Sequence, residues 1–176
     1  MTGKKFLNQL ANGKSDVIQL FLDQLEKLKI EYCVIGGLAV NAYAEPVASL
    51  DLDLVLAIKD VEKLVKNVSK PERDFTVTEF THGINLQHPD SDLRIQIHTD
   101  ERYQSFIKNS SSKSVLGYKM QVASMEDLLK GKIWSYSDEE RRKSKRQKDL
   151  ADIMRLVETY SQLIELIPEN IKKLIG

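Results

Sequence analysis

The sequence has few of the features that mark secreted, membrane-spanning or strongly charged proteins. Its 176 residues include a single cysteine, Cys33, so an internal disulfide is excluded. Lysine and arginine together number 26, as do aspartate and glutamate, so no net charge draws the whole molecule toward nucleic acid or an acidic membrane. The sequence has no run of about 18 apolar residues, and its first residues lack the apolar stretch of a signal peptide. We therefore expect a cytoplasmic protein without membrane contact, in which Cys33 is a buried, inert thiol.

The spacing of apolar residues predicts an α/β (α+β) fold, a mixed β-sheet with flanking helices and a C-terminal helical segment. Ser15 or Asp16 is expected to cap a first amphipathic helix, whose apolar stripe serves either the core or a dimer surface. The expected strands cover residues 31–35, 50–58, 75–80, 84–88, 93–98 and 118–122. The expected helices cover residues 15–30, 38–43 and 60–68, the last capped by Asp60, with another starting at 124 and a long one over 137–160. A polar loop is expected over 108–114, where three serines follow one another.

These elements predict one compact unit with three parts. Residues 1–30 form an N-terminal helical part, residues 30–122 form the α/β core, and residues 123–176 form C-terminal helices packed on that core.

The most informative stretch joins a diglycine turn to a strand that carries two acids. Gly36 and Gly37 follow a buried strand, and Asp51 and Asp53 lie on the next strand with one leucine between them. Side chains two apart on a strand share a face and lie roughly 6 to 7 Å apart. Like charges so placed destabilise a sheet unless a cation lies between them, and hard carboxylate oxygens suit a divalent metal. The pair therefore predicts metal-assisted chemistry.

The motif resembles that of the polymerase-beta-type nucleotidyltransferase superfamily. The superfamily has a Gly-Gly or Gly-Ser turn, a helix, and then Gly-x-Pro-Arg-x-Thr-x-Asp-hydrophobic-Asp. Here residues 44–53 read Ala-Glu-Pro-Val-Ala-Ser-Leu-Asp-Leu-Asp after the diglycine, in the same register. A later helix with a lysine, followed by Arg-x-Lys-Asp-x-x-Asp at residues 146–152, is similar to a second element of the family. The resemblance covers about residues 30 to 157 and is nearest to the small bacterial branch that contains abortive-infection-type toxin nucleotidyltransferases.

The resemblance implies transfer of a nucleotide from a nucleoside triphosphate to a hydroxyl acceptor on an RNA, a protein or a small molecule. It implies Mg²⁺, or Mn²⁺, held by Asp51 and Asp53. It implies contacts with the nucleotide from glycines at a helix start, a hydroxyl and a lysine-bearing helix. The implied nucleotide-binding residues are Gly36, Gly37, Ser49, Lys132, Lys148 and Asp149, with Asp149 orienting or screening Lys148.

The sequence departs from the family pattern at two places in the expected site. Gln96 stands at the position of the third catalytic carboxylate, and a neutral amide supplies neither charge nor a proton acceptor. His98 shares the strand face of Gln96 and is either a substitute ligand or base, or a solvent-facing histidine. Val47 stands where the signature has arginine, which removes a phosphate contact. These losses predict degraded or altered activity.

Two functions of different classes remain open. One is the metal-dependent transferase; the other is a non-catalytic member of the fold that binds a nucleotide or a cognate partner protein, as in a toxin–antitoxin or phage-defence pair. The basic run over 141–148 either contacts phosphate or RNA, or forms i to i+4 ion pairs with the acids at 138–140. Asp149 and Asp152 share a helix face, which is either a solvated face or part of the site.

Overall fold

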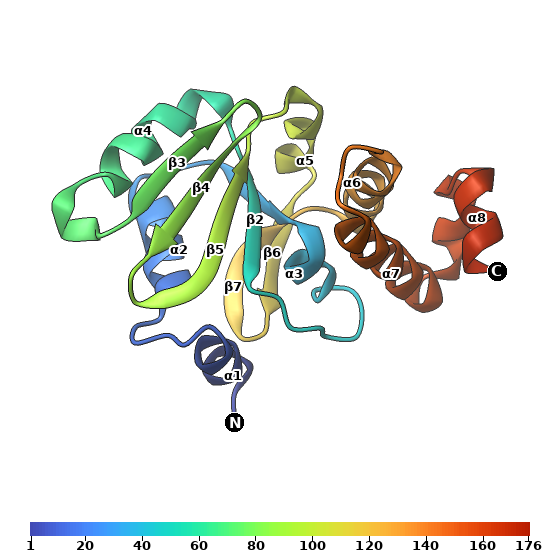
Figure 1. The fold of residues 1–176 in the computed structure, drawn as a ribbon, viewed down its shortest axis with the longest axis horizontal. Coiled ribbons are helices and arrows are strands. Elements are labelled where there is room, and N and C mark those ends of the chain that lie inside the picture. Colours follow the sequence, from blue (N-terminus) through green and yellow to red (C-terminus); the bar gives the residue numbers. More distant parts are fainter.

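The computed structural model describes all residues from Met1 to Gly176. It contains a seven-stranded mixed sheet in the strand order β3-β4-β5-β2-β1-β7-β6 (Figure 1). The pairs β2/β5 and β1/β7 are parallel, and the other neighbours are antiparallel. The strands are β1 (Tyr32–Ile35), β2 (Asp51–Leu56), β3 (Thr76–Phe80), β4 (Gly83–His88), β5 (Ser91–His98), β6 (Ser111–Val115) and β7 (Tyr118–Val122).

Most of the helices lie in two groups beside this sheet. In Figure 1, α2 and α4 lie beside the half of the sheet that holds β3, β4 and β5, whereas α6, α7 and α8 stand together beyond α3. Helix α3 packs against β1, β2, α6 and α7 and so connects the sheet to the C-terminal helices. The helices are α1 (Gly3–Leu10), α2 (Val17–Lys27), α3 (Gly36–Val40), α4 (Ile58–Val68), α5 (Ser105–Lys108), α6 (Met125–Ser137), α7 (Lys143–Thr159) and α8 (Glu169–Ile175). The chain also contains three 3₁₀ turns, η1 (Pro71–Arg73), η2 (Glu101–Tyr103) and η3 (Ser161–Leu166). No helix has the length and apolar character needed to span a membrane.

Strand β2 is central because its side chains alternate between core and site. Leu52 and Leu54 are fully buried, whereas Asp51 and Asp53 on the opposite face are partly exposed. Buried apolar residues from α1 and α2, the sheet, and α6 to α8 form one continuous cluster. The burial of the leucines fixes the register of β2 and thereby directs both carboxylates away from the core.

The predicted α/β class, with a mixed sheet, flanking helices and a C-terminal helical segment, is confirmed. Asp16 caps α2 through a hydrogen bond from the Gln19 backbone N–H, and Cys33 is buried, as expected. Burial raises the pKa of the Cys33 thiol to about 12, which keeps it protonated.

Three local predictions are wrong. The polar stretch 108–114 is not all loop, because Ser111–Val115 is an edge strand paired with β7 through a tight turn at Leu116 and Gly117, both with positive φ. The helix expected over 137–160 begins only at Lys143, because residues 138–142 form a non-helical interruption between α6 and α7. Asp60 does not cap α4, which begins at Ile58; its buried carboxylate instead accepts a hydrogen bond from the Glu31 backbone N–H.

Candidate active site

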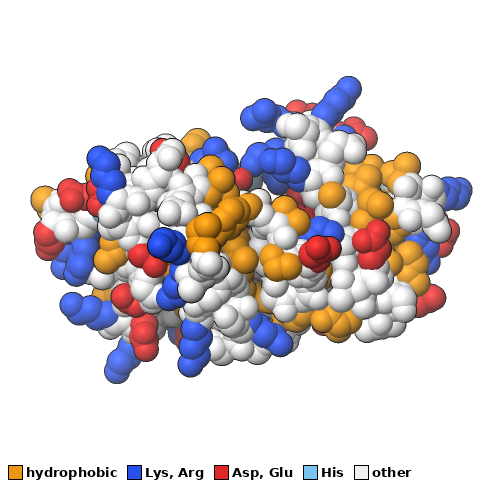
Figure 2. Space-filling model, turned by 90° about the horizontal axis from the view of Figure 1, so that it is seen from below, with side chains coloured by type: hydrophobic (Ala, Val, Ile, Leu, Met, Phe, Trp, Pro, Cys, Tyr) orange, Lys and Arg blue, Asp and Glu red, His pale blue; other side chains and the backbone are white.

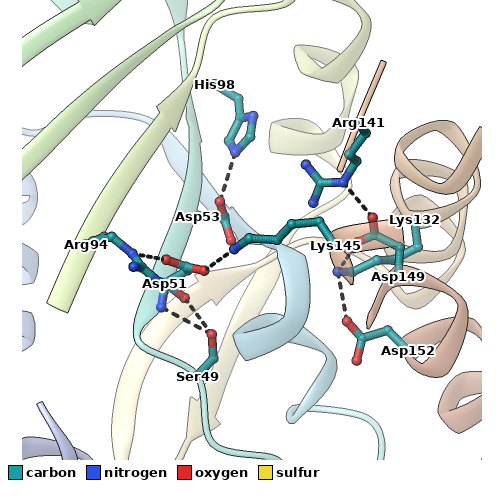
Figure 3. Close-up of polar contacts among 10 residues, drawn as sticks. All are labelled: Ser49, Asp51, Asp53, Arg94, His98, Lys132, Arg141, Lys145, Asp149 and Asp152. Carbon is teal, nitrogen blue, oxygen red and sulfur yellow. Dashed lines mark hydrogen bonds and ion pairs between the residues drawn. The ribbon is translucent and has the colours of Figure 1, made fainter. Parts of the chain in front are cut away.

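The two aspartates of β2 lie beside the polar residues of β5. In the parallel register, Asp51 is opposite Arg94 and Asp53 is opposite Gln96. Because neighbouring positions in a sheet share a face, Arg94, Gln96 and His98 all lie on the side of the sheet that carries the aspartates. Figure 3 shows Arg94 and His98 pointing toward Asp51 and Asp53. The structure thus places Gln96, the residue at the expected third-carboxylate position, next to Asp53.

Each aspartate already has cationic or imidazole partners. Asp51 accepts hydrogen bonds from Arg94 Nε at 2.6 Å and from Lys145 Nζ at 2.9 Å, one on each carboxylate oxygen (Figure 3). His98 Nε2 lies 3.0 Å from Asp53 Oδ1. Burial acts to raise the pKa of Asp51, but Arg94 and Lys145 outweigh it and hold this pKa below its usual value. These partners explain how the sheet tolerates two adjacent carboxylates.

The diglycine brings the start of α3 against these carboxylates. Ile35 pairs with Asp53 across β1 and β2, so the next residue, Gly36, lies beside the Asp53 side chain. Gly36 has φ +77°, and a Cβ there would lie 2.5 Å from Asp53 Oδ2. A Cβ on Gly37 would lie 3.2 Å from Asp152 Oδ2. Glycine at position 36 is therefore required both by the backbone conformation and by the approach of Asp53.

We expect Gly36→Ala to lower the free energy of unfolding by about 1–3 kcal/mol, because the new methyl group must displace Asp53 while the backbone keeps a strained φ. Urea unfolding followed by circular dichroism measures the loss. Gly37→Ala is the matched control. Gly37 has no positive φ, and the contact of its added Cβ with Asp152 Oδ2, at 3.2 Å, is longer than the 2.5 Å contact of a Cβ on Gly36 with Asp53 Oδ2. Equal losses for the two variants would contradict this account of Gly36.

A buried ion-pair network lies behind the diglycine, between α6 and α7. Lys132 Nζ lies 3.0 Å from Asp149 Oδ1 and 2.8 Å from Asp152 Oδ2, and its side chain is 10% exposed. Arg141 Nε donates to Asp149 at 2.7 Å, and Arg155 Nη1 donates to Asp152 at 2.6 Å. Burial acts to lower the pKa of Lys132, but Asp152 and Asp149 more than compensate and raise it. The network is built from opposite charges that satisfy one another.

This network corrects two interpretations of the sequence. Asp149 and Asp152 are buried, so they do not form a solvated helix face. Asp149 bonds to Lys132 and Arg141 and makes no bond to Lys148, so it does not orient that lysine. The acids at 138–140 form no ion pairs with the basic run; Arg141 instead pairs with Asp149 and Lys145 with Asp51, so the i to i+4 explanation of this run is wrong.

The remaining predicted residues lie around a groove next to Asp51. The exposed side chain of Lys148 lines this groove and forms no ion pair. Ser49 also lines it, and its hydroxyl accepts a hydrogen bond from the backbone N–H of Asp51 at 3.1 Å. The backbone N–H and C=O of Val47 both bond to the Asn41 side chain, which holds the segment before β2 in place.

Two adjoining cavities meet at the aspartates. The outer groove has a volume of about 430 Å³ and is lined by six Lys or Arg side chains and four Asp side chains, so cations are in excess. The inner cavity has a volume of about 170 Å³ and includes His98, Gln96, Tyr103 and Phe106. Figure 2 shows Lys and Arg side chains at the hollow between the sheet and the C-terminal helices. The groove thus favours an anion, and the inner cavity offers a smaller, partly aromatic wall.

The structure reveals contacts that sequence reasoning missed. Arg94 and Lys145 hold Asp51, and Arg141 holds Asp149; the sequence analysis assigned Arg94 no role and assigned the basic run that contains Arg141 and Lys145 other partners. For Arg94 a signal existed, because it shares the strand face of Gln96. Lys145 lies three residues before Lys148 and thus on nearly the same helix face. His98 bonds to Asp53 and is 35% exposed, so it is not simply a solvent-facing histidine.

The donor set fits a hard divalent cation that also takes phosphate oxygens. No group of three or more His, Cys, Asp or Glu side chains is arranged to hold a metal ion by itself. Mg²⁺, however, is commonly bound by one or two carboxylates together with the phosphates of its substrate and water. Asp53 Oδ2 forms no hydrogen bond or ion pair, and both aspartates face the cation-rich groove. Asp51 and Asp53 are the residues that would hold such an ion.

Similar solved structures are nucleotidyltransferases. The lincosamide antibiotic adenylyltransferase LnuA, bound to lincomycin, has a TM-score of 0.56 and 13% identity, covering 82% of this chain and 98% of its own. ANT(2")-Ia in complex with adenylyl-2"-tobramycin has a TM-score of 0.60 and 15% identity, covering 91% and 97%. A nucleotidyltransferase-like protein from Paracoccidioides brasiliensis has a TM-score of 0.54 and 19% identity, covering 86% and 75%. No protein-family model matches the chain, and no curated protein matches its sequence. The chain therefore has the nucleotidyltransferase fold.

Proposed function

We propose that the protein is a divalent-metal-dependent nucleotidyltransferase, which transfers a nucleotide from a nucleoside triphosphate to a hydroxyl acceptor. The observation that carries this proposal is the pair Asp51 and Asp53, side by side on β2 at the edge of a groove with excess positive charge. The nucleotidyltransferase folds of the similar structures support it. The proposed metal is Mg²⁺ or Mn²⁺.

The reaction requires one phosphorus–oxygen bond to form and another to break. The acceptor hydroxyl oxygen bonds to the α-phosphorus, the bond from that phosphorus to the bridging oxygen breaks, and pyrophosphate leaves with its electron pair while the hydroxyl gives its proton to solvent water. A bound Mg²⁺ would neutralise phosphate charge and align the two oxygens. Such transfer depends chiefly on positioning and electrostatic stabilisation, which this chain's residues supply around the groove.

The chain's own residues divide these tasks. Lys148 is free to contact a phosphate in the groove, and the C-terminal helices supply this cation while β2 supplies the carboxylates. We propose accordingly that residues 30–122 and 123–176 act as one unit, with the site between them. His98, through its contact with Asp53, holds this carboxylate in position. The inner cavity beside His98 is the proposed entry for the acceptor hydroxyl.

Specific features also favour a non-catalytic relative as the alternative function. Gln96 supplies no charge beside Asp53, and both oxygens of Asp51 are already paired. A protein that holds a nucleotide or a partner without turnover would need neither a third carboxylate nor a free Asp51. The proposed place in the abortive-infection branch, and in a toxin–antitoxin or phage-defence pair, rests on the sequence resemblance of residues 30 to 157.

Thermal unfolding with each nucleoside triphosphate and Mg²⁺ tests the proposed function. A ligand that binds only the folded state raises the melting temperature, so we expect a rise that requires both metal and triphosphate. The double variant Asp51→Asn and Asp53→Asn should lose the metal-dependent part of the rise. Glu31, which pairs with Lys59 away from both cavities, gives the control Glu31→Gln, in which one carboxylate is neutralised outside the site. If the double variant is stabilised like the parent, the metal site is misplaced.

Production of nucleoside monophosphate and pyrophosphate, with water as the acceptor, separates the two functions. The transferase should release both from at least one triphosphate in the presence of Mg²⁺ or Mn²⁺. Tight triphosphate binding with no release under any metal would instead assign the protein to the non-catalytic class.

A further inference from the structure

The Lys145 side chain reaches from α7 to the carboxylate of Asp51 on β2. Its amine donates to Asp51 Oδ2 at 2.9 Å, while Arg94 takes the other oxygen (Figure 3). Lys145 lies in the first turn of α7, just after the interruption at residues 138–142, and it lines both cavities. The amine thus occupies the approach to an oxygen that the proposed metal would use.

The pair formed by Lys145 is weakly held. The Lys145 side chain is 34% exposed and forms no second ion pair, so water screens its attraction to Asp51. Lys132 differs, because its side chain is 10% exposed and two carboxylates hold its amine. Lys132 is fixed in the buried network, whereas rotation about the Lys145 side-chain bonds is enough to release Asp51.

A triphosphate in the groove would offer the Lys145 amine another anionic partner. Without the triphosphate, a divalent cation at Asp51 would lie against the Lys145 ammonium and be repelled. With the triphosphate bound, the ammonium can leave Asp51 for a phosphate oxygen in the groove, which the Lys145 side chain already lines. The same movement relieves the repulsion and adds an attraction, so metal and nucleotide should favour each other's binding.

We propose that Lys145 is a displaceable counter-ion that occupies Asp51 while the groove lacks a nucleotide and opposes metal binding until a triphosphate arrives. The proposal rests on the proposed function, since it takes Asp51 as a metal ligand. Its consequence is that the site discriminates against free metal and assembles only with metal and nucleotide together. Lys145 is a positioning residue in this scheme.

Binding of Mn²⁺ to the nucleotide-free protein, measured by electron paramagnetic resonance, tests the proposal without any turnover. Lys145→Met removes the charged amine and keeps an unbranched side chain that is one atom shorter, and Arg94 still pairs with Asp51. We expect Lys145→Met to bind Mn²⁺ about tenfold more tightly than the parent, a change of about 1.4 kcal/mol. A non-hydrolysable triphosphate should tighten Mn²⁺ binding strongly in the parent and much less in Lys145→Met.

Lys143→Met is the matched control, because it removes the same charge from the same turn of α7 at an exposed residue that lines neither cavity. Its Mn²⁺ affinity should equal that of the parent. If Lys143→Met tightened Mn²⁺ binding as much as Lys145→Met, the tightening would come from the change in net charge of the protein, and the proposal would be overturned. If Mn²⁺ binding depends on Asp51 but is unchanged in Lys145→Met, then Lys145 does not oppose metal binding. That result would overturn the proposed role of Lys145 and leave the proposed function standing. Absence of Mn²⁺ binding in the parent and in Lys145→Met, with or without triphosphate, would overturn both.

Discussion

Replacing Lys132 by Met should lower the free energy of unfolding by about 3–5 kcal/mol, the usual cost of removing one partner from a buried ion pair. The two carboxylates that hold its amine are almost fully buried, with side-chain exposures of 2% for Asp149 and 12% for Asp152. Arg141 and Arg155 would remain as partners but approach from other sides. Urea unfolding monitored by circular dichroism measures the loss.

Two further variants separate the network from helix effects. Lys130→Met removes an exposed lysine from the same helix, with its nearest carboxylate at 3.6 Å, and should cost less than about 1 kcal/mol. Adding Asp152→Asn to Lys132→Met should recover part of the stability, because one uncompensated charge is then neutralised. A loss for Lys132→Met as small as that for Lys130→Met would show that the network does not stabilise the fold.

The network matters for the site because it holds α6 and α7 in place behind the diglycine. Asp152 approaches Gly37, and Arg155 also bonds to the Asn41 side chain just after α3. Lys145 and Lys148 on α7 therefore face β2 from a helix that the network anchors. The protein combines a network of buried charges with the half-exposed Lys145 and the exposed Lys148 at the groove.

The parts of this arrangement that depend on local periodicity could be predicted from the sequence. Alternation along a strand placed Asp51 and Asp53 on one face, and Gln96 and His98 on one face of the later strand. The parallel pairing of β2 with β5, which brings these faces together, is a tertiary feature that periodicity does not contain. The sequence identified the diglycine. The reason why position 36 requires glycine is the close approach of Asp53, which only the three-dimensional structure shows.

The helical half of the site was less predictable. A run of basic residues after three acids suggests pairs along one helix, but the break at residues 138–142 separates them and leaves the acids outside α7. Arg141 and Lys145 then find partners on other elements, because buried and half-buried carboxylates there attract a cation more strongly than exposed ones. Similarly, polar serines suggested a loop where backbone hydrogen bonds with β7 suffice to form an edge strand.

Gln96 is where the chain departs most from the family it resembles, and restoring an acid there should raise activity. Gln96 lies opposite Asp53 and lines the inner cavity, so a carboxylate at this position would face the same space as both aspartates. It would add anionic charge where a second metal needs it, whereas an amide supplies only a dipole. We expect Gln96→Glu or Gln96→Asp to raise pyrophosphate release by roughly tenfold or more, equivalent to about 1.4 kcal/mol of the barrier.

The matched control places the same charge one strand farther away. Asn85 on β4 pairs with Gln96 but lines neither cavity, so Asn85→Asp should leave the metal-dependent rate unchanged. Without metal, Gln96→Glu should also destabilise the fold, because it sets a third like charge beside Asp53, and Mn²⁺ should reverse that loss. Rapid transfer by the parent, together with a slower rate in Gln96→Glu, would contradict the prediction. The amide would then contribute to the site as it stands, and the strand of Gln96 would not correspond to the one that carries the third carboxylate in the family.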